Sequence, residues 1–176
     1  TAMPLTHAAR VASGALGVTL MFAALQLLPL AEVTAIAWSN PLFVVLLAAL
    51  LLGERMGRAH VAATALGFAG VLTLTRPGTA ALDPVALLAV GAALAIAVEV
   101  TLVRRLATRD PPLVVLAINN LAGAGLSGVA ALPVFVWPAA AQWPWLAAVG
   151  VVMVAGQFLF VLAMARAPAA FVAPFY

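Results

Sequence analysis

The residues of this chain best suited to chemistry stand together in the middle of a long apolar run, 33–52. Pro41 directly follows Trp38, Ser39 and Asn40. Proline lacks a backbone donor and crowds the carbonyl one turn earlier, so a helix here should kink or break. Backbone groups freed inside a bilayer need partners or line a cavity. We predict that Trp38, Ser39 and Asn40 offer an aromatic wall and hydrogen-bonding groups to a substrate. The alternative is a packing kink, with Ser39 and Asn40 bonded to neighbouring helices.

Glu99 is the one acidic residue well inside an apolar run. A charge at the centre of a bilayer costs about 2.5–3.5 kcal/mol on insertion scales, so acidic residues there are rare and often functional. Glu99 could face a wet cavity, as the partner of a substrate cation or as a proton site. Equally, its side chain could reach toward the aqueous face near Arg104 or Arg105.

Amide side chains also interrupt the apolar runs, at Gln26, Asn119, Asn120 and Gln157. Their cost in lipid predicts that they face the interior of a helix bundle. Interhelical hydrogen bonding and lining of a polar path both remain open for each of them. Asn119 and Gln157 are kept as candidate site residues.

Patterns typical of enzymes and metal sites are missing from the sequence. There is no cysteine, which excludes disulfides and thiol chemistry, and His7 and His60 are isolated. No His-Glu-x-x-His, Gly-x-Ser-x-Gly or P-loop pattern occurs. We therefore expect neither catalysis nor a bound metal or cofactor.

The composition requires that these residues be held by membrane-spanning helices. Hydrophobic residues make up 66% of the 176 residues and charged residues 7%, with a net charge of +3. A soluble domain carries about 25% charged residues, so a soluble enzyme or a nucleic-acid-binding module is excluded. Runs of about 20 apolar residues span a bilayer as helices. The runs are 11–28, 33–52, 59–74, 83–103, from 110–112 to 133, and from 143–144 to 165; a seventh begins near Pro168.

Arginine placement predicts the orientation of these spans. Alternate breaks between the runs collect nearly all the arginines, namely Arg10, Arg55, Arg58, Arg104, Arg105, Arg109 and Arg166, whereas the other breaks hold only Arg76. The positive-inside rule assigns the arginine-bearing side to the cytoplasm. Trp137, Trp143 and Trp145 fall on the opposite side, as interfacial tryptophans do.

An internal repeat relates the stretches 22–38 and 160–176. Both combine an aromatic residue, a small apolar helix end, a proline in the turn and small residues entering the next helix. Five predicted spans separate the two copies, so they should cross the membrane in opposite directions, as in an inverted-topology repeat. The repeat matches Tyr176 to Trp38, which predicts that both face a central cavity.

Three sequence motifs of this chain resemble the EamA-type drug/metabolite transporter superfamily. Residues 30–43 include the proline inside a helix, residues 51–55 read Leu-Leu-Gly-Glu-Arg at a helix end, and the glycine-rich run 67–78 ends in Arg-Pro-Gly. The stretch 157–169 agrees in the second half. The resemblance implies ten helices in two inverted five-helix repeats, cytoplasmic termini and movement of small metabolites. Residues 1–78 would then be the last three helices of the first repeat, and 79–176 the first three and a half of the second. Two helices would precede Thr1, and the rest of the seventh span and one more would follow Tyr176.

The sequence thus predicts an all-α polytopic membrane protein, with six full helices and part of a seventh, in a bacterial inner membrane. Its predicted function is secondary transport by alternating access, as an exporter of amino-acid-like or other small polar or amphipathic compounds. A channel-like facilitator and a non-transporting membrane subunit are the alternatives. The site is predicted at Trp38, Ser39, Asn40, Glu99, Asn119, Gln157 and Tyr176. Glu54 and Arg55 are predicted to form a structural or gating ion pair. The bilayer and a small-molecule substrate are the expected partners; protons and a second copy of the chain are further candidates.

Overall fold

The computed structural model describes residues 3–54, 57–75 and 84–175, and all regular structure within these ranges is helical. The helices are α1 (Pro4–Leu25), α2 (Leu30–Ala37), α3 (Asn40–Leu52), α4 (Arg58–Thr75), α5 (Pro84–Ala107), α6 (Pro112–Ala131), α7 (Trp143–Arg166) and α8 (Ala169–Val172). Short 3-10 turns are η1 (Leu132–Val134), η2 (Ala140–Gln142) and η3 (Ala173–Phe175).

Five helical segments of the described chain are long and apolar enough to cross a membrane, which confirms the predicted all-helical, multi-pass architecture. They are α1, α2 with α3, α5, α6 with η1, and η2 with α7. The helix α4 occupies the third predicted run, and its apolar part within the described residues covers Val61–Gly70. The seventh predicted run starts after Pro168, as α8 followed by η3.

Prolines mark several helix starts, because the backbone N–H groups of the first turn have no acceptor within the helix and proline lacks that N–H. Proline stands at the first or second position of α1, α3, α6 and α7. The first helix begins at Pro4 rather than at the predicted residue 11. His7 and Arg10 are buried within it, so their polarity does not end the helix. At the other kind of boundary, Gly53 takes a left-handed φ of 65° and ends α3 where the run was predicted to end.

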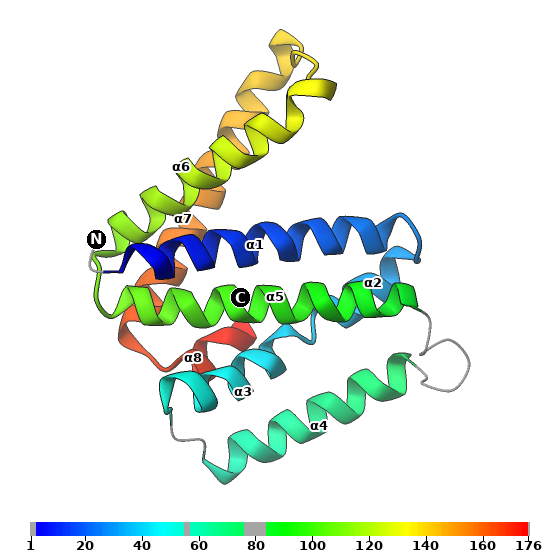
Figure 1. The fold of residues 1–176 in the computed structure, drawn as a ribbon, viewed down its shortest axis with the longest axis vertical. Helices are drawn as coiled ribbons and strands as arrows, with labels where there is room; N and C mark the ends of the chain where they lie inside the picture. Colours follow the sequence, from blue (N-terminus) through cyan, green and yellow to red (C-terminus); the bar gives the residue numbers. More distant parts are fainter. Residues whose placement is uncertain (1–2, 55–56, 76–83, 176) are drawn as a thin grey trace.

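The helix α5 is the hub of the structure. Figure 1 shows α1 and α5 side by side, with α2 and α3 on another flank of α5 and α4 at the outer edge. The α6–α7 hairpin extends away from this group (Figure 1). In the apolar window of α5, 44% of the residues are buried, against 6% in the window that covers α7.

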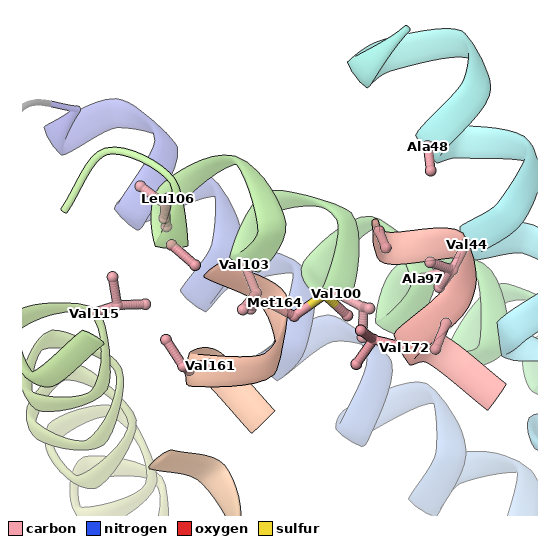
Figure 2. Packing of buried hydrophobic residues seen from close by; sticks show 13 residues of the cluster. Val44, Ala48, Ala97, Val100, Val103, Leu106, Val115, Val161, Met164 and Val172 are labelled. Carbon is pink, nitrogen blue, oxygen red and sulfur yellow. The ribbon is translucent and has the colours of Figure 1, made fainter. Parts of the chain in front are cut away.

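The main core joins both halves of the chain. Val44 and Ala48 of α3 pack in one buried cluster with Val100 of α5, Met164 of α7 and Val172 of α8 (Figure 2). A smaller cluster joins the end of α1 to α2 and the start of α5. The residue ranges 1–78 and 79–176 therefore share one apolar core.

Glycines allow α1 to approach α5 closely. A Cβ on Gly17 would lie 2.8 Å from a side-chain carbon of Ile96, and one on Gly14 would lie 2.8 Å from a carboxylate oxygen of Glu99. Small residues at such contacts strengthen helix packing in lipid, where apolar side chains gain little from leaving water. The glycines of α1 therefore permit close packing on α5, and Gly14 in addition makes room for a charged group.

Candidate functional site

The predicted break at Asn40-Pro41 is confirmed. The helix α2 ends at Ala37 and α3 begins at Asn40. The backbone N–H of Ser39 donates to the carbonyl of Ile36 at 3.0 Å, and that of Leu42 donates to Ser39 at 3.0 Å. These short-range bonds tighten the break and satisfy part of the backbone freed there. A single 23-residue span is thus interrupted near its middle.

The three side chains at the break have different surroundings. Trp38 is 72% exposed, so its indole is open to a ligand or to another part of the complete protein. Ser39 is buried, and its hydroxyl donates to the carbonyl of Ile36 at 2.6 Å. This bond lies within the chain's own turn rather than with a neighbouring helix. Asn40 is half-buried as the first residue of α3.

Glu99 pairs with Arg10 of α1 rather than with Arg104 or Arg105. The Arg10 Nε and Glu99 Oε1 atoms lie 3.7 Å apart, and the two side chains are 6% and 20% exposed. The alternative of a carboxylate reaching toward Arg104 or Arg105 is therefore wrong for this structure. The reason is the packing of α1 on α5, which brings Arg10 to the same level while Gly14 leaves room for the carboxylate.

A second polar contact ties the start of α1 to the loop before α6. His7 Nε2 and Asp110 Oδ2 lie 2.9 Å apart, and both side chains are buried. Arg10 also donates from its guanidinium to the carbonyl of Val115 at 3.1 Å. His7 looks isolated in the sequence, but in the structure it contacts Asp110, which is 103 positions away. The sequence indicated this contact only by placing His7 and Asp110 on the same predicted side of the membrane.

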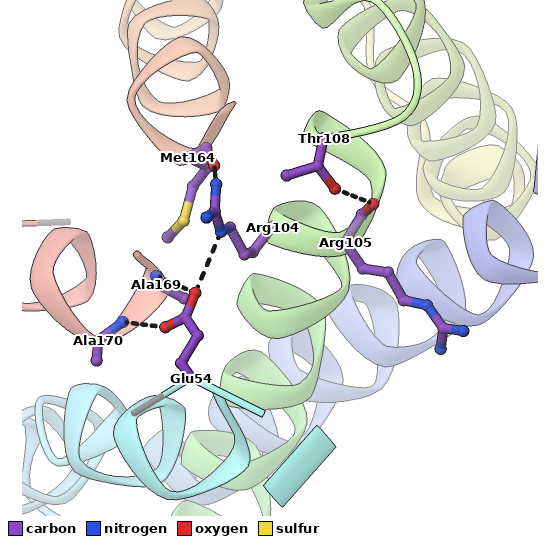
Figure 3. A network of polar contacts seen from close by, with 7 residues as sticks. All are labelled: Glu54, Arg104, Arg105, Thr108, Met164, Ala169 and Ala170. Carbon is purple, nitrogen blue, oxygen red and sulfur yellow. Dashed lines mark hydrogen bonds and ion pairs between the residues drawn. The ribbon is translucent and has the colours of Figure 1, made fainter. Parts of the chain in front are cut away.

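Glu54 is bound by Arg104 and by two backbone groups (Figure 3). Arg104 Nε donates to Glu54 Oε1 at 3.2 Å, and the N–H groups of Ala169 and Ala170 donate to the same carboxylate at 3.0 and 3.4 Å. Arg104 also donates to the carbonyl of Met164. The predicted partner, Arg55, lies outside the described residues.

The amides on α6 and α7 form an interhelical contact. Asn120 Nδ2 donates to Gln157 Oε1 at 3.2 Å and to the carbonyl of Leu116 at 3.0 Å. Gln157 therefore joins the two helices, as one of its two predicted roles required. Asn119 is half-buried beside this contact. Gln26 lies just past α1 and is exposed, so it is not a buried amide.

The described contacts divide the predicted site residues among three places. Trp38, Ser39 and Asn40 lie at the α2–α3 break, Glu99 faces α1, and Asn119 and Gln157 belong to the α6–α7 hairpin. Tyr176 lies outside the described residues. Groups of three or more His, Cys, Asp or Glu that could hold a metal do not occur in the part of the chain that was searched, 3–54, 57–75 and 84–175.

Two hollows beside α6 contain none of the predicted site residues. One, of about 620 Å³, is lined by α6 and α7, including Leu116 and Val154. The other, of about 520 Å³, lies between α1 and α6, with His7 on its wall. Both are lined mainly by apolar side chains, as expected for surfaces that meet lipid tails or another helix.

Within the described residues, Arg10, Arg104 and Arg166 lie at one end of the bundle, which we call the arginine end and define by these three residues. The start of α1, the ends of α3, α5 and α7, and the start of α6 all lie there, on the left of Figure 1. The contacts of Arg104 with Glu54 and Met164, and of Arg10 with Val115, hold these termini together. The alternation of arginines in the sequence thus corresponds to one face of the structure.

Comparison with known proteins identifies the family. Residues 7–76 match the EamA-like transporter family. A riboflavin transporter of Rhizobium johnstonii is 36% identical over 99% of this chain and 58% of its own length. The chain is thus similar to EamA-like transporters, and residues 7–76 match the family itself. The resemblance inferred from residues 30–43, 51–55 and 67–78 is therefore confirmed.

Two further proteins align with nearly all of this EamA-like chain. A riboflavin transporter of Vibrio cholerae serotype O1 is 30% identical over 96% of the chain and 57% of its own length. A solved crystal structure, 28% identical, superposes with a TM-score of 0.69 over 97% of this chain and 73% of the other. The chain thus spans less than two thirds of the length of the two riboflavin transporters.

Proposed function

We propose that the complete protein containing this EamA-like chain is a secondary transporter of small metabolites, and that its substrate is riboflavin or a similarly flat aromatic compound. The observation that carries this proposal is the interrupted span α2–α3, with the Trp38 indole exposed directly beside the break. Interrupted helices surround the substrate sites of many transporters. The names of the two bacterial relatives support the substrate class.

The residues at the break suit a flavin chemically. An indole face stacks on flat aromatic rings, which supports Trp38 as a platform for the tricyclic ring system. The amide of Asn40 offers one acceptor and two donors, which can pair with the carbonyl and N–H groups at the edge of that ring system. Ser39 contributes less directly, because its hydroxyl already donates to Ile36. The amino-acid-like substrate remains the second proposal, and the same assay tests it.

Alternating access would use the two halves 1–78 and 79–176 as inverted units. The similarity of the stretches 22–38 and 160–176 supports their equivalence. Tyr176 would then stand opposite Trp38, and Asn119 and Gln157 would line the path from the second unit. In this proposal the arginine end faces the cytoplasm of a bacterial cell.

Flux measurements on the complete gene product in proteoliposomes test this function. We expect saturable riboflavin transport with counterflow, and a fall of about fivefold or more in Trp38→Ala and Asn40→Ala at equal protein abundance, because each loses a contact worth about 1 kcal/mol or more. Trp137→Ala, which removes another exposed tryptophan, should transport normally. Unchanged flux in both site variants would reject the site, and flux without counterflow would indicate a channel. If amino acids compete for transport and flavins do not, the substrate class is amino-acid-like rather than flat and aromatic.

Glu99 is proposed as the proton-coupling group of the same transporter. It is an acidic side chain inside a span, partly exposed and within 3.7 Å of a single arginine nitrogen. Glu99→Gln should abolish the dependence of flux on an imposed pH gradient, whereas Glu32→Gln, at an exposed position, should retain it. A Glu99→Gln protein that still responds to the gradient would remove Glu99 from this role.

A further inference from the structure

The carboxylate of Glu54 connects three segments of the chain at the arginine end (Figure 3). It follows α3 directly, and its partners are Arg104 of α5 and the N–H groups of Ala169 and Ala170 at the start of α8. Charge-assisted hydrogen bonds of this kind are roughly twice as strong as neutral ones. One side chain therefore holds the end of α3 against both α5 and α8.

The contact has a natural plane of separation. Arg104 donates at the same time to the carbonyl of Met164, at the end of α7. Arg104, Met164 and Ala169 all belong to the second half of the chain, whereas Glu54 belongs to the first. If α3 moves away from α5 and α8, Arg104 keeps its contact with Met164, and the bonds of this network that are lost are those to the Glu54 carboxylate.

The exposure of the pair suits reversible opening. The Arg104 and Glu54 side chains are 19% and 15% exposed. A pair fully open to water contributes little to stability. A pair wholly buried is costly to separate, because each charge loses its partner in a medium of low polarity. Partial exposure lets water take over the bonds as they break.

Apolar side chains close the space beneath this contact. Val44 of α3 and Ala97 of α5 are fully buried, and Val172 of α8 is nearly so (Figure 2). They belong to the same cluster, which lies between the two halves. Because Val44 is fully buried among these side chains, movement of α3 away from α5 and α8 would expose it.

We propose that Glu54 and Arg104 form a latch that closes the arginine end, and that the latch must open for this end to admit water and substrate. The inference deepens the proposed function, because alternating access requires one closed end at a time. Arg105 is the natural comparison. It is adjacent to Arg104, but its side chain is exposed and points away from Glu54 (Figure 3).

Thiol accessibility in the complete gene product tests the latch without any substrate. Val44→Cys is introduced alone, in a background in which any flanking cysteine is serine, and is treated with a membrane-impermeant maleimide in inverted and in right-side-out vesicles. We expect Glu54→Gln to raise the labelling rate about tenfold or more, from the arginine end only, because several charge-assisted bonds are lost together. Arg105→Gln should leave the rate unchanged.

Each outcome decides the proposal. If Glu54→Gln does not accumulate, Arg104→Lys replaces it, since a lysine keeps the charge but cannot bond the carboxylate and the Met164 carbonyl with a planar fork. A folded variant with an unchanged labelling rate would overturn the latch, and so would the loss of both variants while Arg105→Gln accumulates. If Glu54→Gln increases labelling but the protein with Glu54 intact carries no flux, the latch is kept and the transport proposal is rejected. If the protein with Glu54 intact carries flux but Glu54→Gln leaves labelling unchanged, the transport proposal is kept and the latch is rejected.

Discussion

The helices α5 and α7 have the same length, and the most apolar parts of the two spans that contain them have the same mean hydropathy, yet they occupy opposite environments. The helix α5 contacts α1, α2, α3 and α7, whereas most residues of α7 are exposed (Figure 1). Where α1 meets α5, the side chains of Glu99 and Ile96 occupy the space beside Gly14 and Gly17. Gly150 and Gly156 of α7 instead have open space where a Cβ would stand. Hydropathy therefore selects the helices that span, but it does not select the helix at the centre.

Shape and charge explain this difference. Lipid tails are as apolar as leucine, so an exposed valine on α7 carries little penalty in a bilayer. Close backbone approach and paired charges are the contacts that distinguish one helix face from another. The helix α5 has both, through Gly14 and Gly17 of α1 and through the pairs Arg10–Glu99 and Glu54–Arg104.

The largest effect is expected where a charge on α5 would lose its partner. Arg10→Met leaves Glu99 unpaired and frees the carbonyl of Val115, and breaking such a buried pair costs about 3–5 kcal/mol. The free energy of unfolding of the complete protein in detergent micelles measures this loss. Arg109→Met, at an exposed position, should change stability little. Equal stability of the two variants would mean that the Arg10–Glu99 pair does not help to hold α1 on α5.

A smaller loss is expected from filling the contact between α1 and α5. Gly14→Ala and Gly17→Ala each place a methyl group 2.8 Å from a side-chain atom of α5, and overpacking of this kind costs about 1–3 kcal/mol. Thermal unfolding of the purified protein reports the change.

Glycine-to-alanine substitutions on the α6–α7 hairpin should instead raise the stability of the protein. Gly125→Ala and Gly156→Ala meet no atom within 4 Å, and alanine favours a helix over glycine by about 0.5–1 kcal/mol. If these variants lost as much stability as Gly17→Ala, the contrast between α5 and the hairpin would be wrong.

The smallest effect is expected within the hairpin itself. A double-mutant cycle of Asn120→Leu and Gln157→Leu should give a coupling energy of about 0.6 kcal/mol, typical of hydrogen bonds between membrane helices. A parallel cycle with Asn119→Leu should give a coupling near zero. A coupling as large as that of the charged pairs would show that polar contacts hold the hairpin as firmly as they hold α5.

Much of the fold could be predicted from the sequence because its signals are local. The apolar runs and the break at Pro41 were readable, and the structure has helices in these runs and a break at the proline, although α1 begins at Pro4 rather than at residue 11. The site was less predictable. Trp38 and Asn40 lie at the predicted break, but the contacts of Glu99 with Arg10 and of Glu54 with Arg104 could not be predicted from the sequence. Arg10 and Arg104 are 89 and 50 positions away from those acids in the sequence, and no periodicity connects them.

The sequence alone determined that this chain forms helices apolar enough to cross a membrane, that one of them breaks at Pro41, and which ends carry the arginines. These features depend on the transfer of each segment from water to lipid and on the backbone limits of proline and glycine, which act within a few residues. Only the tertiary structure decided that α5 is the hub, that Arg10 meets Glu99, and that Glu54 reaches Arg104 and α8. Those choices depend on how glycine-lined faces fit and on which charges share a space, and both arise only when distant segments pack together.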